Sequence, residues 1–296
     1  MKLLALILGL LLERAAAQGL RLREPRWLDS YFDAGLARIK SLGPSAALPI
    51  LLLLLIIAVL PVLVLSRLLT GAAIAWDLPY ALFAVLVVFL CLGPKDLASE
   101  VDEYCAALDR DDDQDAQRVL TALAESRHSL SAATEVVEEA VFMQATNRVF
   151  GVLFWFTLLG PVGAWLFAVS NLMRRRTVFE ALRDAALRPA ALPAAERLHG
   201  ILAWAPARLA ALGYALSGSF DDAVNGWRSY AELSETPFHQ GNERLVAIVG
   251  KAAMTGYLEQ PANSSAAARN SLRLVMRTLF IWLTVIALMT LFGWAV

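Results

Sequence analysis

The stretch LFWFTLLGPVGA, residues 153–164, decides how this chain is organised. It lies in a run from 149 to 173 that carries no charged side chain, and the run is followed by three arginines at 174–176. A helix needs roughly 20 apolar residues to cross a hydrocarbon core of about 30 Å. The run therefore predicts a membrane helix, and the small residues Gly160 and Gly163 predict close contact with a neighbouring helix.

Other parts of the chain share this apolar character. Of the 296 residues, 58% are hydrophobic and 18% are charged, whereas soluble domains have nearer a half and a quarter. Residues 46–66 and 278–296 carry no charge, and residues 78–93 reach the length of a span only if 72–76 join them. No strand periodicity is evident. We therefore expect an all-α, polytopic helical membrane protein with about four transmembrane helices plus extramembrane amphipathic helices.

The predicted organisation follows the order of apolar and charged segments. Residues 94–148 hold thirteen acidic and five basic side chains, so this part is a poor binder of nucleic acid, and no nucleic-acid partner is expected. Six segments result: a short apolar helix with a basic connector (1–45), two membrane helices (46–93), an acidic helical segment outside the membrane (94–148), a third membrane helix (149–173), a helical segment outside the membrane or at its interface (174–273) and a C-terminal membrane helix (274–296).

Local patterns place individual helices more closely. Apolar residues at helical spacing predict an amphipathic helix over 28–39 and another helix over 194–216. The run Asp111-Asp112-Asp113 predicts the end of one helix and the N-cap of the next. A further helix is expected to pass through Asn147 and Phe150 directly into the apolar run.

The N-terminus leaves two readings open. Residues 3–12 are apolar and precede Ala15-Ala16-Ala17, as in a cleaved secretory signal. Glu13 and Arg14 lie between these two elements, where signal peptides rarely carry charges. We expect a retained, partly inserted helix, with a cleaved signal as the alternative.

Membrane topology is also open. The basic connector 20–45 favours a cytoplasmic position, since cytoplasmic loops are rich in Lys and Arg. Three crossings would then place the arginines at 174–176 on the opposite side. That conflict disappears if residues 198–216 also enter the membrane, or if 149–173 is re-entrant.

Metal and disulfide chemistry is not expected. Cys91 and Cys105 lack the spacing of a disulfide framework or of a metal site. The histidines, His128, His199 and His239, are scattered without cysteine or carboxylate at ligand spacing. We expect no metal, and no phosphate-binding loop indicates a nucleotide cofactor.

Three motifs together resemble a known group of proteins. Leu-Leu-Glu-Arg at 11–14, the LFW…LG-x-x-GA pattern at 153–164 and Pro-Ala-Arg-Leu at 206–209 are similar to the CobD/CbiB superfamily of bacterial inner-membrane proteins, and within it to the AmpE family. The resemblance implies a multi-pass protein of the inner membrane that modulates β-lactamase induction. It also implies a link to recycling of cell-wall muropeptides, with the AmpD-type muropeptide amidase as functional companion.

The same resemblance bears on the site. CobD/CbiB proteins join an aminopropanol-type amine to a corrinoid carboxylate, and they carry acidic residues before LFW. Here Asn147 is kept, but Phe142 and Thr146 stand where the superfamily has glutamates, and His128 replaces an aspartate. No catalytic residue is therefore expected. The residues expected to line a ligand site are Arg148, Asn171, Arg208, Asn147 and Arg127.

The function expected is that of a non-catalytic modulator that binds a small ligand or a muropeptide-pathway component at the lipid bilayer. The alternative is a membrane-bound amide-forming synthase of the adenosylcobinamide-phosphate synthase type. For Arg208, the competing hypothesis is a structural role, in which the buried arginine either caps a helix end or pairs with Glu139. A transporter is disfavoured, because the long apolar runs hold few polar residues.

Overall fold

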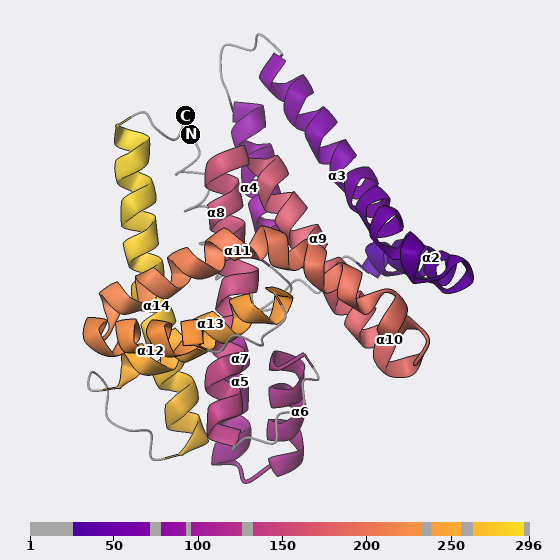
Figure 1. The fold of residues 1–296 in the computed structure, drawn as a ribbon. Coiled ribbons are helices and arrows are strands. Elements are labelled where there is room, and N and C mark those ends of the chain that lie inside the picture. Colours follow the sequence, from indigo (N-terminus) through magenta and orange to yellow (C-terminus); the bar gives the residue numbers. More distant parts are fainter. Residues whose placement is uncertain are drawn as a thin grey trace. The chain divides into compact units, whose positions relative to one another are not determined.

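The computed structural model describes residues 26–71, 78–92, 96–125, 133–232, 238–255 and 263–292 (Figure 1). These ranges contain helices joined by turns and no strand, which confirms the all-α prediction. They form two compact units. The described part of unit 1 lies in 26–92 and 151–203, and that of unit 2 lies in 96–150 and 204–292. The transitions between the units at 150/151 and at 203/204 fall within helical chain.

Unit 1 is built around one buried helix. Helix α9 (Pro161–Arg183) packs against most other helices of the unit, and its buried residues extend from Pro161 to Ala181. The remaining elements of the unit are α2 (Arg26–Leu42), the 3-10 turn η2 (Pro44–Ala46), α3 (Ala47–Gly71), α4 (Leu78–Cys91), α8 (Gly151–Leu159), α10 (Leu187–Ala190) and the first part of α11 (Leu192–Ser217).

The apolar run at 149–173 is not a single helix, so this prediction is wrong. Helix α8 ends at Leu159, and α9 begins at Pro161 and packs back along α8. Gly160 between them has φ 63° and ψ −150°, a conformation that essentially only glycine adopts. Pro161 has no N–H to continue α8 but suits the first position of α9. The sequence reading overlooked this pair of helix-breaking residues.

The two helices of this hairpin approach closely at two glycines. A Cβ atom at Gly163 would overlap the carbonyl oxygen of Trp155, and one at Gly151 would overlap the ring of Phe167. Pairing of residues 151 with 167 and 155 with 163 is what an antiparallel hairpin centred on Leu159 produces. The predicted close-packing role of Gly163 is confirmed, and its partner is the preceding helix of the same run.

Helices α2 and α3 differ in what they bury. Helix α2 is amphipathic and buries Leu28, Phe32, Leu36 and Ile39, which confirms the helix predicted over 28–39. Helix α3 leaves large apolar side chains exposed along its length, as a helix in contact with lipid does. They include Leu53, Ile56, Ile57, Leu60 and Val64.

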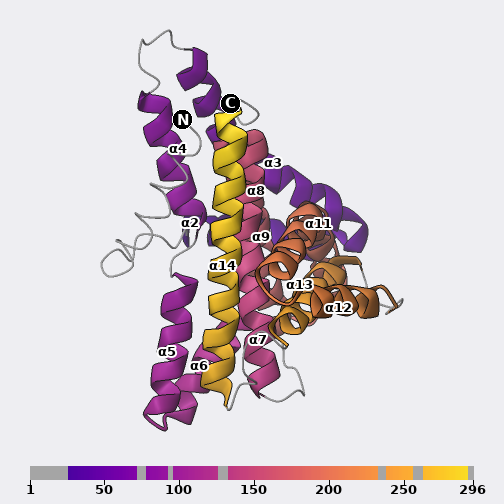
Figure 2. The same ribbon diagram turned by 90° about the vertical axis from the view of Figure 1, so that its left-hand side faces the viewer.

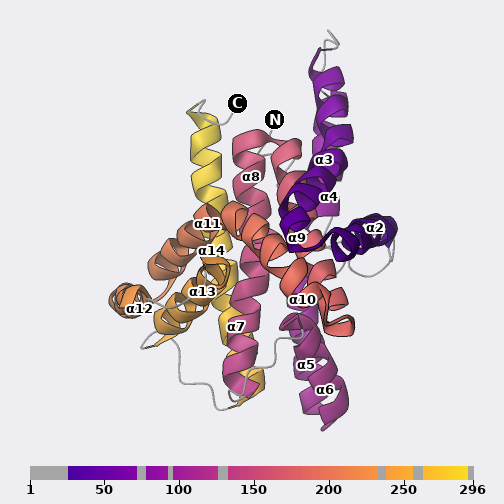
Figure 3. The ribbon, with the colours of Figure 1, turned by 45° about the vertical axis from the view of Figure 1, so that its right-hand side comes forward.

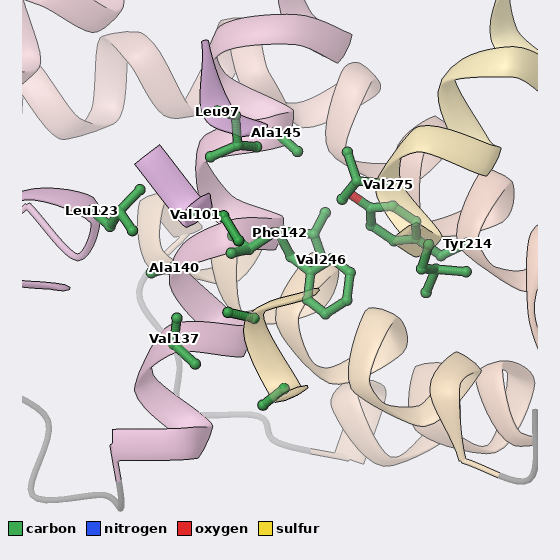
Figure 4. Packing of buried hydrophobic residues seen from close by; sticks show 14 of the residues in the cluster. Leu97, Val101, Leu123, Val137, Ala140, Phe142, Ala145, Tyr214, Val246 and Val275 are labelled. Atoms are coloured by element: carbon green, nitrogen blue, oxygen red, sulfur yellow. The ribbon is translucent and has the colours of Figure 1, made fainter. Parts of the chain in front are cut away.

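Unit 2 is centred on α7 (Ala133–Ala145), which packs against α5, α6, α13 and α14 (Figure 4). Phe142 of α7 is fully buried beside Tyr214 of α11, with ring centroids 5.0 Å apart. Helices α12 and α13 lie side by side (Figure 2). The other elements are α5 (Leu97–Asp109), α6 (Asp113–Leu123), the π-helix η3 (Thr146–Phe150), α12 (Phe220–Glu232), α13 (Phe238–Met254) and α14 (Ser264–Leu291).

Two of the local predictions in unit 2 hold. Asp112 caps α6, because its side chain accepts a hydrogen bond from the Asp115 N–H at 3.0 Å. The helix of α7 continues through η3 into α8 without a break, as predicted for Asn147 and Phe150.

Among the described residues, two helical segments are long and apolar enough to cross a membrane, Pro44–Thr70 and Ser264–Leu291. Less than a quarter of the apolar window of each is buried, so neither is the core helix of a soluble domain. Helix α4 is apolar but shorter than these two segments. Residues 72–77, which the sequence analysis joins to it, lie outside the described residues, and so do residues 1–25, for which a short N-terminal helix is predicted.

The contacts in the α8–α9 hairpin predict that an alanine at Gly151 can be rescued by a second substitution and that an alanine at Gly163 cannot. Gly151→Ala and Gly163→Ala should each destabilise the purified protein by about 1–3 kcal/mol, because neither contact has room for a methyl group. Phe167→Leu should rescue Gly151→Ala, whose obstacle is a side chain. It should not rescue Gly163→Ala, whose obstacle is backbone. Thermal unfolding in detergent measures all four variants, and two harmless alanines would contradict the packing.

Candidate functional site

The junction of α7 and α8 is a π-helix that carries two of the predicted site residues. Asn147 and Arg148 lie in η3, and both side chains are buried. Short π-helical segments are rare and occur frequently at functional sites, because the widened turn redirects side chains. The sequence motif indicated these residues but gave no sign of the change in helix type.

Arg148 is neutralised by a carboxylate from another helix. Its Nη1 donates to Oε2 of Glu100 at 2.8 Å, and the two side chains are 7% and 16% exposed. Glu100 lies in the first turn of α5, which Asp96 caps. A charge this far from water requires a partner, so the pair also ties α5 to η3. Sequence reasoning missed Glu100, because 48 residues separate the two side chains.

Gln144 extends this polar region by one helical turn. Its Nε2 donates to the carbonyl oxygen of Leu123 at 2.7 Å and to Oε1 of Glu125 at 3.2 Å. Residues four apart on a helix lie on one face, so Gln144 and Arg148 share the side of the helix that meets α5 and α6. We call Glu100, Gln144, Asn147 and Arg148 the polar layer.

Arg148 and Gln144 of the polar layer each have one buried side-chain atom without a hydrogen-bond partner. The two atoms are Nε of Arg148, a donor, and Oε1 of Gln144, an acceptor. Leaving such a group unsatisfied costs about 1–3 kcal/mol, so native proteins rarely do it without a reason. A bound molecule with an acceptor for Arg148 and a donor for Gln144 would remove both costs.

Aromatic contacts show which part of α14 lies near the polar layer. The ring of Phe150, the last residue of η3, lies 5.2 Å from that of Trp282 and 6.0 Å from that of Tyr214. Arg277 is the last charged residue of α14, and the described residues from 278 onward carry no charge. The polar layer therefore lies near the point where α14 becomes wholly apolar.

The other predicted site residues have separate surroundings. Asn171 is in unit 1, where its Oδ1 accepts a hydrogen bond from Nη2 of Arg174 at 3.0 Å. Arg127 lies outside the described residues. Only Asn147 and Arg148 of the five are neighbours in one described element.

Arg208 of α11 has neutral partners. Its Nη1 donates to the carbonyl oxygen of Trp204 and to Oδ1 of Asn242, each at 3.0 Å, and its guanidinium lies 4.2 Å from the centroid of the Trp204 ring. The structural alternative of a pairing with Glu139 is wrong, because Glu139 pairs with Lys251 at 3.9 Å. Glu139 is on α7, whereas the contacts of Arg208 hold α11 to α13.

Unit 1 contains a buried hydroxyl–imidazole contact that sequence reasoning did not single out. Oγ of Ser170 donates to the carbonyl oxygen of Phe167 at 2.7 Å and lies 3.0 Å from Nδ1 of His199. The tautomer of His199 determines which of the two groups donates. The contact joins α9 to α11 by a buried hydrogen bond.

The comparison with known proteins agrees with the motifs. The whole chain, residues 1–296, matches the family described as regulatory signalling modulator protein AmpE. The chain belongs to the AmpE family.

Two relatives of this AmpE-family chain are each described as cobalamin biosynthesis protein CobD. The one from Stutzerimonas stutzeri is 29% identical over 212 residues, which cover 67% of this chain and 65% of the relative. The one from Chromobacterium violaceum is 30% identical over 173 residues, covering 57% and 53%. The chain thus spans about two thirds and about half of the length of these relatives. No solved structure matches the chain.

The buried pair predicts a large coupling energy. Arg148→Ala and Glu100→Ala should each cost about 3–5 kcal/mol, since each strands a buried charge, while the double variant should cost less than their sum. The exposed pair Arg118–Asp115 is the matched control, with an expected coupling of at most about 1 kcal/mol. Additive losses at Arg148 and Glu100 would contradict the pairing.

A buried carboxyl on α7 predicts a pH dependence. Burial raises the pKa of Glu138 above its usual value, Lys251 opposes the shift, and Glu135 and Glu139 add to it. The folded state then binds more protons than the unfolded state between the two pKa values, so stability falls as pH rises through that window. Glu138→Gln should abolish this fall in a pH series of unfolding temperatures, and an unchanged profile would refute the assignment.

Proposed function

We propose that this chain is a multi-pass inner-membrane modulator of β-lactamase induction, which acts by binding a small ligand or a partner and not by catalysis. The match of the whole chain to the AmpE family supports the regulatory class. The exposed apolar surfaces of α3 and α14 support insertion into a membrane. The ligand is proposed to come from the muropeptide pathway, in which an AmpD-type amidase is the functional companion.

The observation that carries the ligand proposal is the pair of unsatisfied atoms in the polar layer. Arg148 offers a buried N–H donor beside a positive charge, and Gln144 offers a buried carbonyl acceptor four residues away. A carboxylate or carbonyl oxygen suits the first, and an amide N–H suits the second. A peptide provides both, so the peptide part of a muropeptide is the proposed ligand chemistry.

The surroundings of the polar layer favour binding over catalysis. An acid–amine ligase needs carboxylates to hold a metal nucleotide and to take a proton from the amine. At the two positions where the wider superfamily has glutamates, Phe142 is buried among aromatic rings and Thr146 donates to the Phe142 carbonyl at 2.9 Å. The carboxylate of Glu100 is engaged by Arg148.

A genetic test uses Arg148→Lys, which keeps a cation for Glu100 but removes the Nε donor. The gene is deleted in frame in its own host, and β-lactamase activity is measured with and without inducer. We expect the deletion to change the induced response, wild type to restore it, and Arg148→Lys to fail at normal membrane abundance.

Arg118→Lys is the matched control, because it makes the same chemical change in an exposed ion pair of the same unit. It should restore induction fully. An unchanged response in the deletion strain, or full restoration by Arg148→Lys, would contradict the proposal.

The CobD relatives give a second candidate, a membrane-bound amide-forming synthase. Complementation of a mutant that cannot complete this step of cobalamin synthesis tests it directly. We expect no growth, because the carboxylate positions are occupied by Phe142 and Thr146. Growth would favour the enzyme and contradict the modulator.

A further inference from the structure

The C-terminal half of α11 carries an exposed apolar stripe with an arginine inside it. Trp204, Leu212 and Leu216 recur at multiples of four residues, which places them on one side of the helix, and Leu209 lies beside the latter two. All four are between 42% and 65% exposed, as is Phe220 at the start of α12. A contiguous apolar surface of this kind marks a contact with another molecule or with lipid.

Contacts with α14 give the level of this stripe relative to the membrane. Oγ of Ser217 lies 2.5 Å from Oγ1 of Thr278, and Gly213 packs against Thr278 and Trp282. These α14 residues directly follow Arg277, where the charge-free part of the helix begins. The large exposed apolar side chains of α14 also begin here, with Phe280, and continue to Phe292.

The part of α11 that belongs to unit 2, from Trp204 to Ser217, runs across α14 and not along it (Figures 1 and 3). A helix that crosses a membrane-spanning helix near the end of its apolar part lies in the plane of the membrane surface. Arg208 fits this position, because an arginine at the centre of the hydrocarbon is costly and one at its boundary is not. Its stacking on Trp204 joins the two residue types that favour the interface.

We propose that residues 204–220 form an interfacial element, in which α11 lies in the membrane plane and its stripe contacts the boundary between lipid head groups and acyl chains. The occupant of the stripe is the bilayer, and the stripe continues the lipid-facing surface of α14 at the same level. A helix α11 in the membrane plane is not a further transmembrane helix. Of the two arrangements that would reconcile the arginines at 174–176 with the positive-inside rule, this rules out the crossing of the membrane by 198–216.

Depth measurements on spin labels distinguish an in-plane helix from a spanning one. Leu209→Cys, Leu212→Cys and Leu216→Cys are labelled and reconstituted into phospholipid vesicles, and depth is read from the accessibility of the label to oxygen and to a water-soluble nickel complex. Wild type, whose Cys91 and Cys105 are both buried, measures background labelling. Phe280→Cys, Val285→Cys and Leu288→Cys on α14, whose side chains are exposed in the half of the span nearer Arg277, give the reference for a spanning helix.

We expect the three α11 labels to report one shared depth just inside the head groups, and the α14 labels to move deeper by about 1.5 Å per residue. A depth change of about 10 Å from residue 209 to 216 would show that α11 spans, and would overturn the proposal. Water-like accessibility, as at Arg269→Cys on the charged half of α14, would overturn it too. Dipolar broadening without lipid contact would also overturn it, because a second copy and not the bilayer would then cover the stripe.

Discussion

The reversal of the chain at Gly160 is the constraint on which unit 1 depends. With φ 63° at Gly160 and a proline after it, α8 must stop, and the close approach of Gly163 to the Trp155 carbonyl directs α9 back along it. Helix α9 then becomes the helix against which the others pack. A side chain at either glycine would separate the pair, so the motif LG-x-x-GA is a requirement of backbone geometry.

Several features of the fold could be predicted from sequence because they are local. The amphipathic spacing of α2, the cap at Asp112 and the continuity from Asn147 to Phe150 need only neighbouring residues to specify them. The absence of charge over 149–173 predicts one membrane helix, since hydropathy does not register a change of direction. The change of direction is indicated by Gly160 and Pro161 together, because Gly160 allows the turn and Pro161 cannot continue the first helix.

The candidate site was predictable in part for a related reason. Motif comparison pointed to Asn147 and Arg148, which do share one buried π-helical turn. Glu100, Gln144 and the neutral partners of Arg208 are long-range consequences of packing, and no spacing rule brings residues 48 or 34 positions apart together. The same packing explains why a charged side chain is tolerated at the buried position 148. Glu100 balances the charge of Arg148, while Nε of Arg148 remains available as a hydrogen-bond donor.

In the proposed function, the polar layer binds a peptide-bearing ligand through Arg148. The most direct measurement is calorimetric titration of a purified muropeptide into the protein held in lipid nanodiscs, for wild type, Arg148→Lys and Arg118→Lys. Loss of one hydrogen bond from a charged group costs about 1.5–3 kcal/mol, or roughly tenfold or more in affinity. We expect equal binding by wild type and Arg118→Lys, and at least about tenfold weaker binding by Arg148→Lys. Equal affinity in all three proteins, or no binding by wild type, would contradict the proposed function.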